Sequence, residues 1–163
     1  RDELDRLERE EPPLGLAFMH FRGTVVAMAA QIEQRADGSV AVARLWASVD
    51  CGQAVLPDAV RAQVEGAAVM GVAFAMREVL HVRGGRRSAQ SLSAYSPLRM
   101  HEAPRVDVVL LPGDGRAGPR GVGEVGLPPV APAIANALFR LDGRRRRALP
   151  LLLDPARTDL PGG

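Results

Sequence analysis

Two runs rich in apolar and β-branched residues, 24–34 and 40–50, have the pattern of neighbouring β-strands. Asp37-Gly38 lies between them, and this dipeptide is a strong short-range signal for a hairpin turn. The sequence therefore predicts an antiparallel β-hairpin across 24–50, with Asp50-Cys51-Gly52 ending its second strand.

The next apolar pattern is helical. Apolar and small residues recur at three- and four-residue steps: Val60, Val64, Ala67, Ala68, Gly71, Phe74, Ala75 and Val79. This spacing predicts a helix over 59–80 with one buried face. Several of these residues are small enough to allow close approach by a neighbouring element or a ligand, although tight helix packing explains each of them taken singly.

The remaining elements are shorter and alternate with loops. They are a turn at 84–85, an irregular segment 88–104 anchored by Tyr95, a buried strand 106–111, a helix from the proline-rich 127–132 to about Asp142, and an apolar tail 149–153 that packs back. Strands that are mostly antiparallel neighbours, together with two long helices, indicate an α+β fold. The chain divides into a charged segment or linker at 1–14, a domain at 15–153 and a tail at 154–163.

Composition places the chain among soluble globular proteins. It has 163 residues, of which 47% are hydrophobic and 25% charged. We find no apolar run near the ~20 residues that a membrane span needs, and no signal peptide. The first residue is Arg1, so we expect the true N-terminus to have been removed or to lie upstream. A cytoplasmic or a periplasmic location is equally compatible with these features.

The charge distribution argues against nucleic-acid binding. The net charge is +2, all 21 basic residues are arginines, and they are mixed with 19 acidic residues. One Trp, one Tyr and four Phe leave few rings for stacking on bases. The densest cluster, 144–147, follows the last predicted helix, where cations favour the helix C-terminus.

Metal and thiol chemistry has little support within this chain. Cys51 is its one cysteine, which excludes an internal disulfide and any multi-cysteine site. We expect Cys51 to be a small buried residue at a strand end. His20, His81 and His101 show no ligand spacing, so we expect no metal to be held by side chains of this chain.

The stretch Gly121-Val122-Gly123-Glu124 is the strongest chemical signal. A carboxylate on a tight glycine turn is free of its own helix and can face a group held from outside, so Glu124 is a candidate general base. Glycines let the backbone approach a bulky partner, and the following helix start supplies free N–H groups. A purely structural helix start explains the same four residues, so both interpretations stay open at this point.

Four segments taken in order resemble one known family. They are Val49-Asp50-Cys51-Gly52-Gln53-Ala54-Val55, Arg61-Ala62-Gln63-Val64-Glu65-Gly66-Ala67, the Gly121–Glu124 stretch, and Pro128-Pro129-Val130-Ala131-Pro132-Ala133-Ile134-Ala135-Asn136-Ala137. This order is similar to the C-terminal part of the molybdopterin-binding large subunit of the xanthine dehydrogenase/aldehyde oxidase family, of the isoquinoline 1-oxidoreductase type. The resemblance extends from about Gly15 to Pro150.

The resemblance implies a hydroxylase that uses oxygen from water to oxidise an aldehyde or an N-heterocycle. In the family the Glu of this loop is the general base, which maps onto Glu124. The Gln that contacts the pterin maps onto Gln63, and the backbone of Gly121, Val122 and Gly123 would run beside the cofactor. A side-chain amide suits a heterocycle edge, because it both donates and accepts hydrogen bonds.

The resemblance also implies partners. The cofactor would be molybdenum-molybdopterin, as the cytosine dinucleotide in the bacterial type, with electrons leaving through iron–sulfur clusters on a small [2Fe-2S] subunit. Family large subunits are several times longer, so the remaining part of the large subunit would be a further partner. We expect the isolated chain to be inactive, because a site needs all its parts pre-organised. A separately encoded docking half and a non-catalytic remnant are the alternatives.

Overall fold

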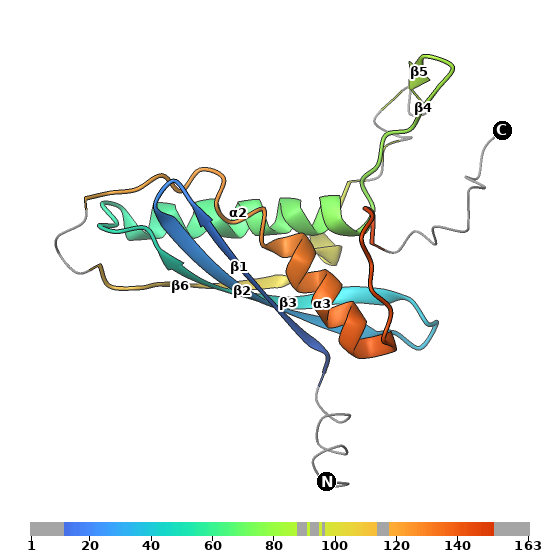
Figure 1. Ribbon diagram of the computed structural model, residues 1–163, viewed down its shortest axis with the longest axis horizontal. Helices are drawn as coiled ribbons and strands as arrows, with labels where there is room; N and C mark the ends of the chain where they lie inside the picture. The colour runs from blue at the N-terminus through green and yellow to red at the C-terminus, as the bar shows by residue number, and fades with distance from the viewer. Residues whose placement is uncertain (1–11, 88–90, 92–94, 96, 114–117, 152–163) are drawn as a thin grey trace, which may run out of the picture.

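The computed structural model describes residues 12–87, 91, 95, 97–113 and 118–151. In this part of the chain a four-stranded sheet carries two helices on one face, which confirms the α+β class (Figure 1). The elements in chain order are β1 (Leu14–Phe21), β2 (Thr24–Gln34), β3 (Val40–Asp50), α2 (Pro57–Met76), β4 (Val82–Arg83), β5 (Arg86–Arg87), the 3-10 turn η1 (Met100–Glu102), β6 (Arg105–Leu110) and α3 (Val130–Asp142). Most of the charged segment predicted at 1–14, and the tail at 154–163, lie outside the described residues.

The predicted hairpin is confirmed as β2 and β3. Its turn contains Gly38 with a φ of 81°, a conformation that glycine adopts without strain. A further strand, β1, which sequence analysis did not predict, pairs antiparallel with β2 across a turn at Arg22-Gly23. The strand order in the sheet is β1-β2-β3-β6.

The strand predicted at 106–111 is confirmed as β6, its pairing was not predicted, and its expected burial is corrected. β6 pairs with β3 in parallel, whereas the other three pairings are antiparallel. It is also half-buried rather than buried, with Val109 60% exposed. The reason is that the helices cover only one face of the sheet, so every second residue of β6 faces outward.

The two long helices cover the sheet side by side. α3 packs over β1 and β2, and α2 packs over β6 and β3. Their buried faces include Val64, Ala68, Ile134 and Leu138, each 0% exposed. The helices approach closely because Gly71 of α2 faces α3: a Cβ at Gly71 would lie 2.7 Å from Cγ2 of Val130. The core therefore lies between the helices and one face of the sheet.

The helix limits differ slightly from the prediction. α2 ends at Met76 rather than at residue 80, and the chain then leads to the β4–β5 hairpin, whose turn is the predicted Gly84-Gly85. In the irregular segment that follows, the hydroxyl of Tyr95 donates a hydrogen bond to the Glu78 carboxylate. This contact ties the predicted aromatic anchor to the end of the helix.

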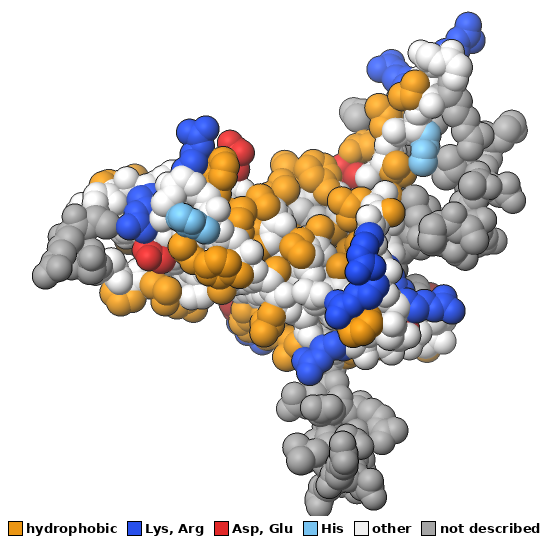
Figure 2. Space-filling model, viewed as in Figure 1, with side chains coloured by type: hydrophobic (Ala, Val, Ile, Leu, Met, Phe, Trp, Pro, Cys, Tyr) orange, Lys and Arg blue, Asp and Glu red, His pale blue; other side chains and the backbone are white. Residues whose placement is uncertain are grey.

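The C-terminal predictions are confirmed as far as the structure describes them. Leu151 is buried, and its N–H donates to the carbonyl of Ala75 at 2.7 Å, so the apolar tail packs back onto α2. The arginines after α3 gather at its end (Figure 2), where Arg146 pairs with Asp142 at 2.6 Å.

Cys51 is buried directly after β3, as expected.

α2 qualifies as a membrane span by length and composition, whereas sequence analysis expected none. It is the one such helix among the described residues. This is weak support for a span, because the core helix of a soluble protein passes the same test. Val64 and Ala68 on this helix are fully buried against the rest of the fold.

Candidate functional site

The glycine loop, defined here as residues 120–127, lies along α2. The side-chain amide of Gln63 donates a hydrogen bond of 2.8 Å from Nε2 to the carbonyl oxygen of Gly123. Three residues further on, Gly126 is buried against α2, because a Cβ there would lie 2.8 Å from the carbonyl oxygen of Val64. The fold therefore brings together the glutamine and the glycine motif, which are 60 residues apart in sequence.

The start of the glycine loop is held by the strand turns beneath it. Thr24 Oγ1 donates to the carbonyl of Gly121 at 2.8 Å, and the backbone N–H of Arg120 donates to the carbonyl of Cys51 at 3.0 Å. The guanidinium of Arg120 donates to the carbonyl of Gly23 at 2.8 Å and lies 3.5 Å from the Asp50 carboxylate.

Sequence analysis did not select Thr24 and Arg120. Arg120 directly precedes the glycine motif, which was a usable signal. The role of Thr24 depends on a contact across 97 residues of sequence, and no local pattern announces such a contact.

Glu124 projects from the middle of the glycine loop. It is exposed, whereas the next residue, Val125, is 2% exposed and anchors the loop in the core. The backbone carbonyl of Glu124 accepts the N–H of Leu127 at 3.2 Å, which closes a turn. Among the described residues the Glu124 side chain makes no hydrogen bond or ion pair, so its carboxylate is available to a group from outside this chain.

The helix after the loop starts later than predicted. α3 begins at Val130, and the Val130 N–H donates to the carbonyl of Leu127 at 3.2 Å. Pro129 and Val130 are both buried. The buried start of α3 thus holds the end of the glycine loop through the bond between Val130 and Leu127.

The fold itself does not explain the glycines of the GVGE motif. A Cβ added at Gly121 or at Gly123 would meet nothing within 4 Å, and neither residue has a positive φ. Gly126 and Gly71, in contrast, are glycines because neighbouring atoms leave no room for a side chain. The open side of Gly121 and Gly123 therefore fits a bulky group that approaches the backbone closely.

A hollow of about 450 Å³ lies at the N-terminus of α2, on the side where β3 and β6 end. It is lined by Gly52, Gln53, Ala54, Pro57, Arg61, Leu110, Leu111, Pro112 and Gly113. Ligands of α/β folds often bind outside the carboxyl ends of parallel strands, which is where this hollow opens. Among the described residues no three His, Cys, Asp or Glu side chains come together as a metal-binding group.

Comparison with known proteins decides the family. A sequence profile described as the molybdopterin cofactor-binding domain matches residues 8–104. The chain belongs to this family. The resemblance noted in the sequence is thereby confirmed, although the profile match ends before the glycine loop.

Two relatives are similar to this chain over most of its length. The isoquinoline 1-oxidoreductase subunit beta of Brevundimonas diminuta is 34% identical over 139 residues, which is 85% of this chain and 18% of the relative. A membrane-bound aldehyde dehydrogenase (pyrroloquinoline-quinone) of Gluconacetobacter polyoxogenes is 38% identical over 117 residues, or 72% of this chain and 15% of the relative. The chain thus spans less than a fifth of the length of either.

A solved structure supports the fold. The aldehyde oxidoreductase of Desulfovibrio gigas superposes with a TM-score of 0.66 at 24% identity, covering 78% of this chain and 14% of that one. The sheet with two helices is therefore an arrangement found within an aldehyde oxidoreductase chain that is much longer than this one.

Proposed function

We propose that this chain is the C-terminal part of the large subunit of a molybdenum hydroxylase that acts on an aldehyde or an N-heterocycle. The observation that carries the proposal is the hydrogen bond from Gln63 to the Gly123 carbonyl, which brings both motifs to one place. Family membership and the relatives' names supply the class of reaction.

In this proposal each motif residue has a separate role. The exposed carboxylate of Glu124 removes a proton from the oxygen that attacks the substrate. The backbone at Gly121, Val122 and Gly123 borders the cofactor, since neither glycine has a neighbour where a Cβ would stand. Gln63 uses one amide N–H on Gly123, which leaves its carbonyl oxygen and its second N–H to bind the edge of the pterin.

The cofactor in this proposal is molybdenum-molybdopterin, as the cytosine dinucleotide. When bound, it supplies the oxidation of the substrate carbon, with electrons passed to the iron–sulfur clusters of a small [2Fe-2S] subunit. The residues of this chain supply orientation and the base. We expect a soluble assembly and no activity from the chain alone, because the rest of the site belongs to the remaining large subunit.

The test is a co-expression of this chain with the remaining large subunit and the small subunit from the same genome. Metal and pterin analysis of the purified complex should find molybdenum with a pterin, and no pyrroloquinoline quinone. Glu124→Gln should retain both and lose turnover by a factor of about 10² to 10⁴, the usual range for a general base. Loss of molybdenum from Glu124→Gln would contradict the base role.

A second variant tests the cofactor contact separately from folding. Gly123→Ala adds a methyl group in open space, so the fold and the thermal transition should stay unchanged. If the cofactor borders this residue, the cofactor content of the complex should fall. An unchanged content together with unchanged turnover would show that the cofactor lies elsewhere.

Two alternatives to this proposal remain, and in both of them the chain alone has no activity. They are a separately encoded half that docks onto the missing part, and a non-catalytic remnant. A remnant that folds independently should have polar outer faces, whereas Leu16 is 70% and Phe18 68% exposed on the open side of the sheet. This exposed apolar surface favours a docking function over an independent remnant.

A further inference from the structure

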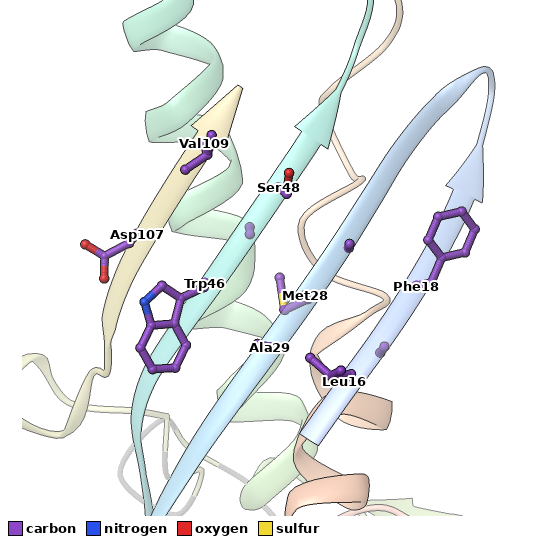
Figure 3. A pocket seen from close by; sticks show the side chains of 11 residues that line it. Leu16, Phe18, Met28, Ala29, Trp46, Ser48, Asp107 and Val109 are labelled. Atoms are coloured by element: carbon purple, nitrogen blue, oxygen red, sulfur yellow. The ribbon is translucent and has the colours of Figure 1, made fainter. Parts of the chain in front are cut away.

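The face of the sheet opposite the helices is uncovered by the described chain. Its outward side chains form two rows across the strands, one of Leu16, Ala29, Trp46 and Asp107, the other of Phe18, Ala27, Ser48 and Val109. Figure 3 shows the labelled side chains of both rows on the near side of the sheet and the helices behind it. Residues directly opposite each other on paired strands point to the same face, so both rows form one continuous surface.

This surface is a groove rather than a plane. Its floor is the central strand β2, where the outward residues are the small Ala27 and Ala29. Leu16 and Phe18 of β1 form one wall, and Trp46 with its neighbours on β3 and β6 forms the other. The hollow between the walls has a volume of about 600 Å³.

The groove is apolar in the middle and mostly polar at its ends. The next row at one end consists of Leu14, Gln31, Arg44 and Arg105, and the row at the other end consists of His20, Val25 and Asp50. The outward face of an antiparallel sheet in solvent is usually polar along its whole length. An apolar centre with a polar rim is typical of a surface that another protein element covers.

The charged groups at the Trp46 wall are already paired within the chain. Arg44 Nε lies 2.6 Å from Asp107 Oδ2, and the Arg44 guanidinium lies 4.8 Å from the centre of the Trp46 ring. The hydrogen bond from Arg44 also lowers the pKa of the Asp107 carboxyl. When the groove is covered, Arg44 and Asp107 therefore still have each other as partners. The occupant needs no charged group to neutralise them and can be apolar.

We infer that this groove is the docking surface for an apolar segment of the remaining large subunit, which packs on Ala27 and Ala29 between the two walls. The inference rests on the proposed function, because it requires the rest of the subunit to be present. The two named relatives extend far beyond the matched region, which is only 18% and 15% of their length. In a complete large subunit, one copy of that remaining part accompanies each copy of this domain and can cover the sheet face.

A second copy of this chain fits the groove less well. A symmetric dimer places the same surface on both sides of the interface. Two concave floors of alanine would then face each other and leave the centre unfilled. A convex segment, such as a helix or a bulky side-chain ridge, fills the groove.

The experiment measures association between this chain and the remaining large subunit from the same genome, each purified separately. Leu16→Glu and Phe18→Glu place a charge on the wall and should each weaken binding at least tenfold. Val82→Glu is the control, because Val82 is 65% exposed on the β4–β5 hairpin, away from the sheet face, and binding should stay within twofold of wild type. Thermal transitions of all three variants check that they fold.

Trp46 offers a direct second readout. It is the one tryptophan of the chain, so incorporation of 5-fluorotryptophan gives a single ¹⁹F resonance. That resonance should shift when the unlabelled remaining subunit binds, and Leu16→Glu should reduce the shift at equal concentration. An unchanged resonance in a formed complex would overturn the inference.

The other outcomes separate the two proposals. Wild-type binding by Leu16→Glu and Phe18→Glu would overturn the docking surface, even if the complex contains molybdenum and is active. Self-association of the isolated chain that Leu16→Glu abolishes would make a second copy the occupant and overturn the inference as well. A complex that depends on Leu16 but contains no molybdenum would support the docking surface and reject the proposed function.

Discussion

Thr24 at the start of β2 donates a hydrogen bond of 2.8 Å from its hydroxyl to the carbonyl oxygen of Gly121. Thr24 is 0% exposed, so this bond forms where the side chain has no access to water. The first loop of the sheet thereby fixes the beginning of the glycine loop. The position of Glu124 thus depends on β2 as well as on α2.

Replacing Thr24 by Val keeps the side-chain volume and removes the donor. We expect the free energy of unfolding to fall by about 1 kcal/mol, the usual net contribution of one hydrogen bond. Chemical denaturation of the chain measures this loss. Thr24→Val should also raise the hydrogen-exchange rates of the glycine-loop amides, whereas Thr24→Ser retains the hydroxyl and should keep these rates at their wild-type values. Wild-type exchange rates in Thr24→Val would show that the bond does not fix the loop.

Replacing Gln63 by Leu removes the second support of the loop. The Gly123 carbonyl then loses its donor, while the exposed position of Gln63 keeps the effect on global stability below about 0.5 kcal/mol. We expect faster hydrogen exchange confined to the glycine loop. Gln63→Glu should have the same local effect at neutral pH, because a carboxylate offers the Gly123 carbonyl no proton. A global change in exchange would contradict this local role.

Two glycines of α2 should respond oppositely to alanine. At Gly66 a Cβ meets nothing within 4 Å, so Gly66→Ala should stabilise the chain by about 1 kcal/mol through helix propensity. At Gly71 a Cβ would lie 2.7 Å from Val130, so Gly71→Ala should destabilise it by about 1–3 kcal/mol through overpacking. Thermal unfolding of both variants measures the contrast. The same sign in both would show that α2 and α3 can separate at little cost.

The ion pair between Arg77 and Glu102 predicts an acid dependence of stability. Two hydrogen bonds from Arg77, at 2.8 and 2.9 Å, lower the pKa of Glu102 from 4.5 to about 2. Because the folded pKa is depressed, the pair stabilises the chain fully above pH 4.5, and this contribution is lost as the pH falls from there towards 2.

Thermal melts at pH 7 and pH 3 check the acid dependence. Glu102→Gln should lower the melting temperature at pH 7 and show a smaller difference from wild type at pH 3. Asp58→Asn, which removes an exposed i,i+3 pair with Arg61, is the control and should have little effect at either pH. A difference between Glu102→Gln and wild type that does not change with pH would contradict the assigned cause.

The predicted elements with local signals are the ones that the structure confirms. Asp37-Gly38 between β-like runs predicted the β2–β3 hairpin, helical spacing predicted α2, and the proline-rich start of an apolar segment predicted α3. β1 was missed because its outward residues Leu16 and Phe18 are apolar like its inward ones, which hides the alternation of a half-exposed strand. The parallel pairing of β6 with β3 depends on the path of the chain through α2, which no local pattern encodes.

The candidate site was predictable in its residues and not in its arrangement. The order of the motifs in the sequence is enough to select Gln63 and Gly121–Glu124 as candidates. The sequence did not reveal that Gln63 holds the glycine loop through Gly123, because this contact depends on how the helices α2 and α3 pack. The roles of these residues towards a cofactor remain a proposal, which the Glu124 and Gly123 variants test.

The backbone of β1 lies directly against α3, at Gly15. A Cβ at Gly15 of β1 would lie 2.0 Å from the carbonyl oxygen of Ala133 in α3, and the side-chain amide of Asn136 donates to the carbonyl of Leu16 across 120 residues. During synthesis, β1 therefore leaves the ribosome long before the helix that covers it. Until α3 emerges, the inner face of β1 has no cover, so this unit completes its folding only after α3 has been synthesised and depends on that helix being intact.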